Sequence, residues 1–138
     1  MDDSESTVLF RVQYHETDRM GTFCNSRALE WFEHGRTELM RTLGIPYTTV
    51  EQRGVFLPVV EAHLHFLGRA QYDDILKIET RAGMAGKASV RFDVTIVHAA
   101  DGAEVVKGHT IHAVTDASGK PVRPPEWFVV PFEEQGKA

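Results

Sequence analysis

Four residues between positions 16 and 25 have side chains and a spacing that suit chemistry at a helix terminus: Glu16, Asp18, Gly21 and Asn25. Asp18 stands just before a long amphipathic stretch that begins near Asn25. A helix N-terminus offers unpaired amides and roughly half a positive charge, which together stabilise a developing oxyanion. Gly21 allows a positive φ or the close approach of a ligand to the backbone. The segment therefore predicts one carboxylate beside a backbone site for an oxyanion.

Asp18 has two possible chemical roles and one structural role. The field of a helix N-terminus favours the ionised carboxylate, which can act as a general base or as a nucleophile. An ordinary aspartate is a weak base at neutral pH, so the nucleophilic or water-orienting role is slightly favoured. Asp is also common in turns, where Asp18 would only close the turn or cap the helix. Asn25 has the same plain alternative as an N-cap, and Glu16 is expected to be a solvated or structural acid.

Other candidate groups carry weaker signals. His63 and His65 share one face of a predicted strand, but no cysteine or carboxylate set at a recognised spacing accompanies them, so no metal site is predicted. Cys24 lies beside the helix N-terminus, which lowers a thiol pKa, and is a secondary candidate nucleophile. The segment 86–89 lacks the glycine spacing and the following helix of a phosphate-binding loop.

The bulk properties limit the class of protein. The chain has 138 residues and a formal net charge of −5, which fit one globular domain and argue against a general nucleic-acid binder. Its one cysteine excludes an intramolecular disulfide. The acidic, polar start does not resemble a signal peptide, and no apolar run approaches the ~18 residues of a membrane helix. The expected location is a reducing cytoplasm.

One long helix must position the candidate site. Apolar residues recur at helical spacing from Ala28 to Leu43, with Asn25 or Ser26 as the N-cap. Gly44 is suited to the C-cap, and Pro46 prevents the helix from continuing. A glycine in mid-helix, Gly35, costs about 1 kcal/mol relative to alanine. Its usual compensation is close packing against another backbone.

The remaining residues predict an antiparallel sheet. Alternating patterns place strands at 8–14, 57–67, 76–81, 89–96 and 105–115. Asp101-Gly102 is a hairpin signal, 83–87 is turn-like, and 121–131 is expected to be extended. The chain, 1–138, is predicted to be a single α+β domain with flexible ends at 1–7 and 133–138. One helix and one five-stranded antiparallel sheet would bury each other's apolar faces.

Several motifs resemble the signature of hotdog-fold acyl-CoA thioesterases, in the 4-hydroxybenzoyl-CoA thioesterase family. The hotdog fold wraps a five-stranded antiparallel sheet around one long central helix. The matching segments are Tyr14-His15-Glu16-Thr17-Asp18-Arg19-Met20-Gly21, Leu29-Glu30-Trp31-Phe32-Glu33, Arg36-Thr37-Glu38, Tyr72-Asp73-Asp74-Ile75-Leu76, Gly108-His109-Thr110-Ile111-His112-Ala113-Val114 and Val122-Arg123-Pro124-Pro125. The resemblance covers nearly the whole chain.

The resemblance implies an enzyme that hydrolyses the thioester of a small acyl- or aryl-CoA to the free acid and coenzyme A. Asp18 would face the thioester carbonyl, near Gly21, and act as general base or form a mixed anhydride. Backbone amides around Asn25 would polarise the carbonyl. The coenzyme phosphates would meet Lys87, Arg91 and Arg69 near strand ends and turns. Sites would lie between protomers of a homodimer or homotetramer, with no cofactor, because coenzyme A is part of the substrate.

The sequence departs from the family pattern directly after Gly21. The family usually has Asn-Tyr before the helix, whereas this chain has Phe23-Cys24-Asn25-Ser26-Arg27-Ala28, with Ala28 in the place of the tyrosine. This departure keeps open a binding module for acyl-CoA or carrier-protein thioesters with little or no turnover. A carrier-bound substrate is a further alternative. A hydratase is disfavoured, because it needs a histidine five residues after the aspartate, where Phe23 stands.

Overall fold

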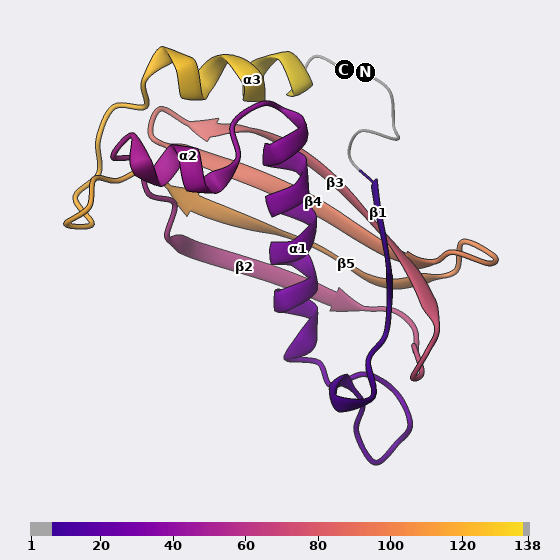
Figure 1. Ribbon diagram of the computed structural model, residues 1–138. Coiled ribbons are helices and arrows are strands. Elements are labelled where there is room, and N and C mark those ends of the chain that lie inside the picture. Colours follow the sequence, from indigo (N-terminus) through magenta and orange to yellow (C-terminus); the bar gives the residue numbers. More distant parts are fainter. Residues whose placement is uncertain (1–6, 137–138) are drawn as a thin grey trace.

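The structure is a computed structural model that describes residues 7–136. Five strands form one antiparallel sheet in the order β1-β3-β4-β5-β2 (Figure 1). The strands are β1 (Thr7–Arg11), β2 (Val59–Phe66), β3 (Ile75–Gly86), β4 (Ser89–His98) and β5 (Glu104–Ala113). The helices are a 3-10 turn η2 (Tyr14–Glu16), α1 (Arg27–Thr42), α2 (Tyr47–Gln52) and α3 (Glu126–Gly136). The predicted architecture of one sheet and one long helix is confirmed.

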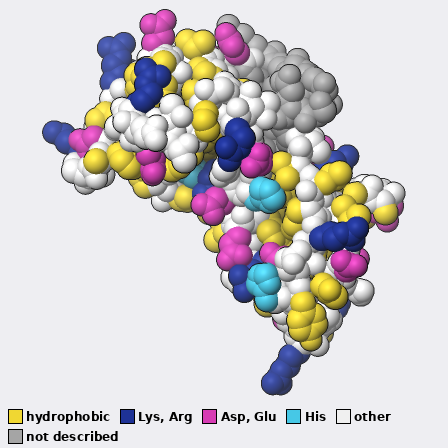
Figure 2. Space-filling model, viewed as in Figure 1, with side chains coloured by type: hydrophobic (Ala, Val, Ile, Leu, Met, Phe, Trp, Pro, Cys, Tyr) yellow, Lys and Arg dark blue, Asp and Glu magenta, His cyan; other side chains and the backbone are white. Residues whose placement is uncertain are grey.

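Helix α1 crosses one face of the sheet over β1, β3 and β4, as Figure 1 shows. Its N-terminal half packs Trp31 and Phe32 into one apolar cluster, and its C-terminal half packs Leu39 and Met40 into a second. Figure 2 shows Asp and Glu side chains interspersed with Lys, Arg and His side chains over the exposed face of the molecule. The amphipathic period of the sequence therefore fixes which side of α1 meets the sheet.

Gly35 lies at the closest approach of α1 to the sheet. A Cβ atom there would come within 2.5 Å of Thr80 Oγ1 and 2.6 Å of Ile78 Cγ2. The expectation of close packing is confirmed, but the neighbours are side chains of β3 and not another backbone. The absence of a side chain at Gly35 thus sets the distance between the helix and the sheet.

Two strand boundaries differ from the sequence prediction by three residues or more. β1 ends at Arg11, not at position 14, because Gln13 and Glu16 form a capping box that starts the 3-10 turn. β3 continues to Gly86 through the segment 83–87 that was predicted as a turn, and β4 begins at Ser89. The cause is the long β3–β4 pairing, which runs with one irregularity to the Gly86–Ser89 pair. The hairpin at Asp101-Gly102 is confirmed, with Gly102 at φ 76°.

The prediction of an extended segment at 121–131 is wrong from Glu126 onward. Helix α3 runs from Glu126 to Gly136 and contains Pro131. Phe128 and Phe132, four residues apart, are completely buried against the sheet. Burying each phenylalanine contributes roughly 1.5–3 kcal/mol, which offsets the ~3 kcal/mol that an interior proline costs. Of the ends expected to be flexible, residues 1–6 and 137–138 lie outside the described residues.

Strand β2 is an edge strand that α1 does not cover. Val59, Val60 and Phe66 are 49%, 62% and 40% exposed, and the adjoining Leu67 is 43% exposed. The predicted alternation of faces is present, since Leu64 packs against the core cluster while His63 stacks on His109 on the other face. The strand therefore presents both apolar side chains and an unpaired backbone edge to solvent.

Candidate active site

A small loop between η2 and α1 holds the candidate acid. Its ends are joined by a bridge between Thr17 and Phe23, and the Asp18 amide donates to the Thr22 carbonyl at 2.8 Å. Gly21 adopts φ 79°, which confirms the predicted need for a positive φ. The Phe23 amide donates to the Ala70 carbonyl at 2.9 Å, which ties the loop to the segment before β3. The loop is thus held from both sides beside the start of α1.

The Asp18 side chain is exposed and partly engaged in the turn. Its Oδ1 accepts from the Met20 amide at 2.8 Å. Within the described residues Oδ2 accepts no hydrogen bond from the protein. The turn-closing role considered from the sequence is therefore real, yet one carboxylate oxygen stays open to solvent and to a ligand.

The start of α1 has unpaired amides. Among the described residues, the amides of Asn25 and Ser26 donate no hydrogen bond to the protein, and both residues are exposed. Ser26 is the N-cap residue, as one of the two predicted alternatives had it, but the expected side-chain cap hydrogen bond is not formed. Ser26 already has helical dihedral angles, with φ −62° and ψ −23°. The amides of Arg27 and Ala28 donate to the carbonyls of Cys24 and Asn25 in tight turns, which form the first hydrogen bonds of the helix. The unpaired amides of Asn25 and Ser26 are the groups that an oxyanion would meet.

Glu16 is a structural acid, as expected. It is 8% exposed, and its carboxylate accepts from the Gln13 amide at 2.7 Å and from Trp31 Nε1 at 2.8 Å. The Glu16 carbonyl accepts from the Cys24 amide at 2.8 Å. Glu16 therefore links η2, the end of the loop and the buried side of α1.

We expect Trp31→Phe to lower the free energy of unfolding by about 1–2 kcal/mol, because it leaves a buried carboxylate oxygen without its donor. Denaturant unfolding measures this loss. The matched control is Trp127→Phe, since Trp127 contacts Arg53 through its ring face, 3.8 Å from the guanidinium carbon, and should lose less. Equal losses in the two variants would contradict a specific role for the Glu16 hydrogen bond.

The structure does not bring the three predicted phosphate-binding residues together within one chain. Arg69 lies beside the Asp18 loop, where its guanidinium donates to the Met20 carbonyl. Lys87 lies in the β3–β4 turn, at the far end of a 12-residue strand, which spans roughly 36 Å. Arg91 lies on β4 and is paired with Asp93 at 3.1 Å.

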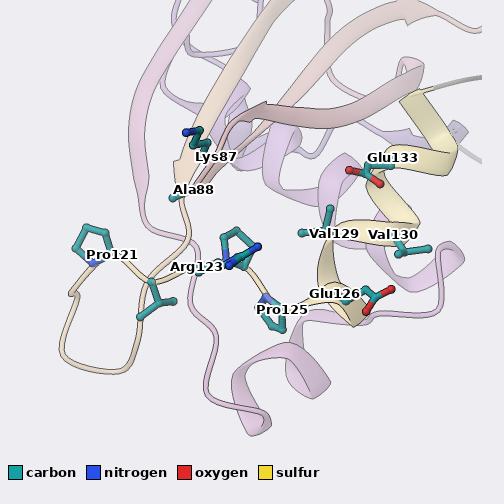
Figure 3. A pocket seen from close by; sticks show the side chains of 11 residues that line it. Lys87, Ala88, Pro121, Arg123, Pro125, Glu126, Val129, Val130 and Glu133 are labelled. Carbon is teal, nitrogen blue, oxygen red and sulfur yellow. The ribbon is translucent and has the colours of Figure 1, made fainter.

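A groove of about 1170 Å³ lies at the Lys87 end of the sheet, not at Asp18. Figure 3 shows Lys87 and Arg123 on its walls, with Val129 and Val130 of α3 opposite. Glu126 and Glu133 stand on the α3 side of the groove. The groove is therefore an apolar channel with basic groups at one wall, distant in this chain from the candidate acid.

A second, smaller pocket was not anticipated from the sequence. It has a volume of about 160 Å³ and lies between α1, α2 and β5, lined in part by Arg36, Tyr47 and His112. The sequence signal for this pocket is Arg36, a basic residue that flanks the apolar stripe of the helix. Within the described residues no group of three or more metal-ligating side chains occurs, and no helix is long and apolar enough to cross a membrane.

The fold and the loop–helix site together define a class, the hotdog-fold thioester hydrolases. Thermus thermophilus protein TT1821 superposes with a TM-score of 0.88 at 29% identity, over 95% of this chain and 99% of that one. The 1,4-dihydroxy-2-naphthoyl-CoA thioesterase Slr0204 from Synechocystis superposes with a TM-score of 0.84 at 17% identity, over 91% and 93%. The second likeness is one of fold. The hotdog architecture predicted from the sequence is confirmed.

The sequence profile of the Thioesterase-like superfamily matches residues 12–132, and the chain belongs to this family. Acyl-CoA thioesterase YbgC of Haemophilus influenzae is 32% identical over 84 residues, 60% of this chain and 62% of that one. The chain spans from 50% to 88% of the length of the first curated relatives that it matches. The expectation of a thioester hydrolase is confirmed at the level of the family.

Proposed function

We propose that this protein hydrolyses the thioester of a small acyl- or aryl-CoA, with Asp18 as the reacting acid. One observation carries the proposal: an exposed carboxylate lies on a loop that is held beside the unpaired amides of Asn25 and Ser26. An anion and oxyanion donors on neighbouring backbone are the two requirements of acyl transfer. The chain works without a cofactor, in the cytoplasm.

Two routes lead to the same products. As a nucleophile, Asp18 attacks the carbonyl carbon, the coenzyme thiolate leaves, and water then hydrolyses the mixed anhydride. As a general base, Asp18 takes a proton from water, which attacks the carbonyl directly. In both routes the amides of Asn25 and Ser26 stabilise the negative oxygen of the tetrahedral intermediate. A single turnover in ¹⁸O-water tests for the nucleophilic route, because water attack on the Asp18 carbonyl of the anhydride leaves the label in Asp18 and an unlabelled oxygen in the product acid, whereas the general-base route labels only the product acid.

The β2 edge supports a dimer with sites between protomers. The Val59 end of β2 lies at the Lys87 end of the sheet, and its Phe66 end lies near the Asp18 loop. Two copies that pair their β2 edges antiparallel about a two-fold axis bring the Lys87 end of one beside the Asp18 end of the other. This arrangement covers the exposed apolar side chains of β2, and two such dimers can form a tetramer.

The same arrangement explains how the separated basic residues serve one coenzyme. Arg69 comes from the protomer that supplies Asp18, while Lys87 and Arg91 come from the second copy. The Arg91–Asp93 pair is exposed, so a phosphate can replace Asp93 at little cost. Arg123, beside Lys87 in the groove of Figure 3, adds a further positive charge.

The direct test is release of free thiol from a panel of short, long and aromatic acyl-CoAs, with the oligomeric state measured in the same buffer. Turnover on any member of the panel supports the thioesterase. Binding of acyl-CoA, seen by mass spectrometry, without thiol release would instead identify a binding module. A strictly monomeric protein with full activity would contradict sites between protomers.

We expect Asn25→Ala to keep activity within about threefold and to leave the melting temperature nearly unchanged. The reason is that the Asn25 backbone amide acts in the proposed oxyanion site, while its side chain forms no cap bond. Steady-state kinetics and thermal unfolding measure the two quantities. A loss of more than about tenfold in kcat would show that the Asn25 side-chain amide takes part in the reaction.

A further inference from the structure

The pocket between α1, α2 and β5 has a charged wall that the proposed reaction does not use. From α1 it is lined by Glu33, Arg36, Thr37 and Met40, which share one side of the helix. Tyr47 and His112 form the opposite wall. Its volume of about 160 Å³ is several times the ~30 Å³ share of one water in the liquid, so a small organic group fits.

Arg36 is the unusual member of this wall. Its side chain is half-buried, and burial lowers the pKa of its guanidinium, against the opposing effect of the Glu33 charge. Within the described residues its guanidinium forms no hydrogen bond and no ion pair. Arg27 and Arg41 on the same helix each pair with a carboxylate, at 3.1 Å and 3.3 Å, although they lie at its surface. Apart from the nearby Glu33 charge this half-buried guanidinium has no partner, which is costly, so Arg36 is available to an anion.

The other polar groups of the pocket are already committed. The His112 Nδ1 lies 2.9 Å from the Leu57 carbonyl, to which it donates, and Nε2 lies 2.9 Å from Thr110 Oγ1. Burial lowers the pKa of His112, which keeps the ring neutral. The Tyr47 hydroxyl accepts from the Leu57 amide at 3.1 Å. Among the described contacts the donors left free are the guanidinium of Arg36 and the hydroxyl of Thr37, while the Tyr47 hydroxyl also interacts with the Glu51 side chain.

We propose that this pocket binds a carboxylate, held by the guanidinium of Arg36 with Thr37 as a second donor. A guanidinium matches the two oxygens of a carboxylate with two parallel hydrogen bonds. Glu33 is exposed at the rim and forms no ion pair with Arg36 in the described structure, so the fork of donors stays open. The neutral walls of His112, Met40 and Leu57 exclude water from the contact and suit the carbon chain of the ligand.

The position of the pocket indicates one source of that carboxylate. Leu57 directly precedes β2, and His112 pairs with Val59, so the pocket lies at the Lys87 end of the sheet. In the dimer paired through β2, this end meets the Asp18 end of the second copy. Resting on the proposed function, the distal carboxylate of an ω-carboxyacyl thioester would then reach Arg36 while its carbonyl meets Asp18. The other source is a free dicarboxylic acid that binds independently of turnover.

The test compares acyl-CoAs of equal chain length that end in a carboxylate or in a methyl group: succinyl- against butyryl-CoA, and glutaryl- against pentanoyl-CoA. We expect wild type to prefer the carboxylate-ended member by about tenfold or more in kcat/KM. Arg36→Met should reduce this ratio to about one. The matched control is Arg41→Met, which removes an exposed arginine of the same helix and should leave the ratio unchanged.

A binding measurement separates this proposal from the thioesterase itself. Calorimetric titration of wild type with glutarate, and with 1,5-pentanediol as the control of equal chain length that carries no carboxylate, reports on the pocket without catalysis. Glutarate binding that Arg36→Met or Thr37→Val weakens supports the pocket even if no thioester is hydrolysed, and binding without a substrate preference assigns it to a free acid. If wild type shows neither the preference nor glutarate binding, the proposal is overturned, whether or not the variants fold.

Discussion

Asp18→Asn should reduce kcat/KM for the best acyl-CoA substrate by at least about 100-fold, which is ~2.7 kcal/mol of transition-state stabilisation. Asparagine is isosteric and keeps an oxygen that can accept the hydrogen bond from the Met20 amide, so the turn survives. It removes the negative charge that attacks the carbonyl or deprotonates water. The measurement is thiol release, with circular dichroism and thermal unfolding to verify that the fold is retained.

The control for this substitution is Asp101→Asn. Asp101 lies in the β4–β5 hairpin, is exposed, and accepts from the Ala103 amide at 2.9 Å in the same kind of turn. Asp101→Asn therefore removes the same charge from the same kind of turn, and the variant should keep full activity. If Asp18→Asn turns over within about threefold of wild type, Asp18 has no chemical role. Cys24, the secondary candidate nucleophile, then becomes the next candidate.

Gly35→Ala should lower the free energy of unfolding by about 2 kcal/mol or more. Alanine improves helix propensity by about 1 kcal/mol, but its Cβ would lie only 2.5 Å and 2.6 Å from Thr80 Oγ1 and Ile78 Cγ2. Both neighbours are β-branched side chains on a central strand with little freedom to move. Helix α1 must therefore lift from the sheet, which opens the core on both sides. Urea unfolding measures the change.

Gly83→Ala is the matched control for the glycine substitution. Gly83 lies in β3, where an added Cβ would have no atom within 4 Å, and its φ is not positive. We expect its stability to stay within about 0.5 kcal/mol of wild type. A Gly35 variant as stable as the Gly83 variant would show that the helix and sheet adjust freely at their closest approach.

The sequence was sufficient for the elements whose pattern is local. The alternation in β4, the amphipathic period of α1 and the hairpin signal at Asp101-Gly102 all depend on neighbours in the chain, and all were predicted correctly. Helix α3 was missed because two prolines precede it and Pro131 lies inside it. Its stability comes from burying Phe128 and Phe132 against distant parts of the chain, which a local pattern does not contain.

The candidate site was predictable in part for the same reason. Asp18 and Gly21 belong to one short loop, and the positive φ of Gly21 followed from its residue type. The N-cap position of Ser26 was predicted correctly, but its side-chain hydrogen bond was not, because tight turns to the carbonyls of Cys24 and Asn25 replace a side-chain cap. The pocket around Arg36 joins residues up to 79 positions apart, from Glu33 to His112, and only the folded chain brings them together.

Because the edge of β2 is open, the association of the protein depends on its concentration. A single chain displays the unpaired backbone of an eight-residue strand together with exposed apolar side chains. In the proposed dimer, pairing through this edge is a second-order event, so dilution would lower the specific activity as dimers dissociate. The same exposed edge is a template for pairing with other unpaired strands, which predicts aggregation when the second copy is absent.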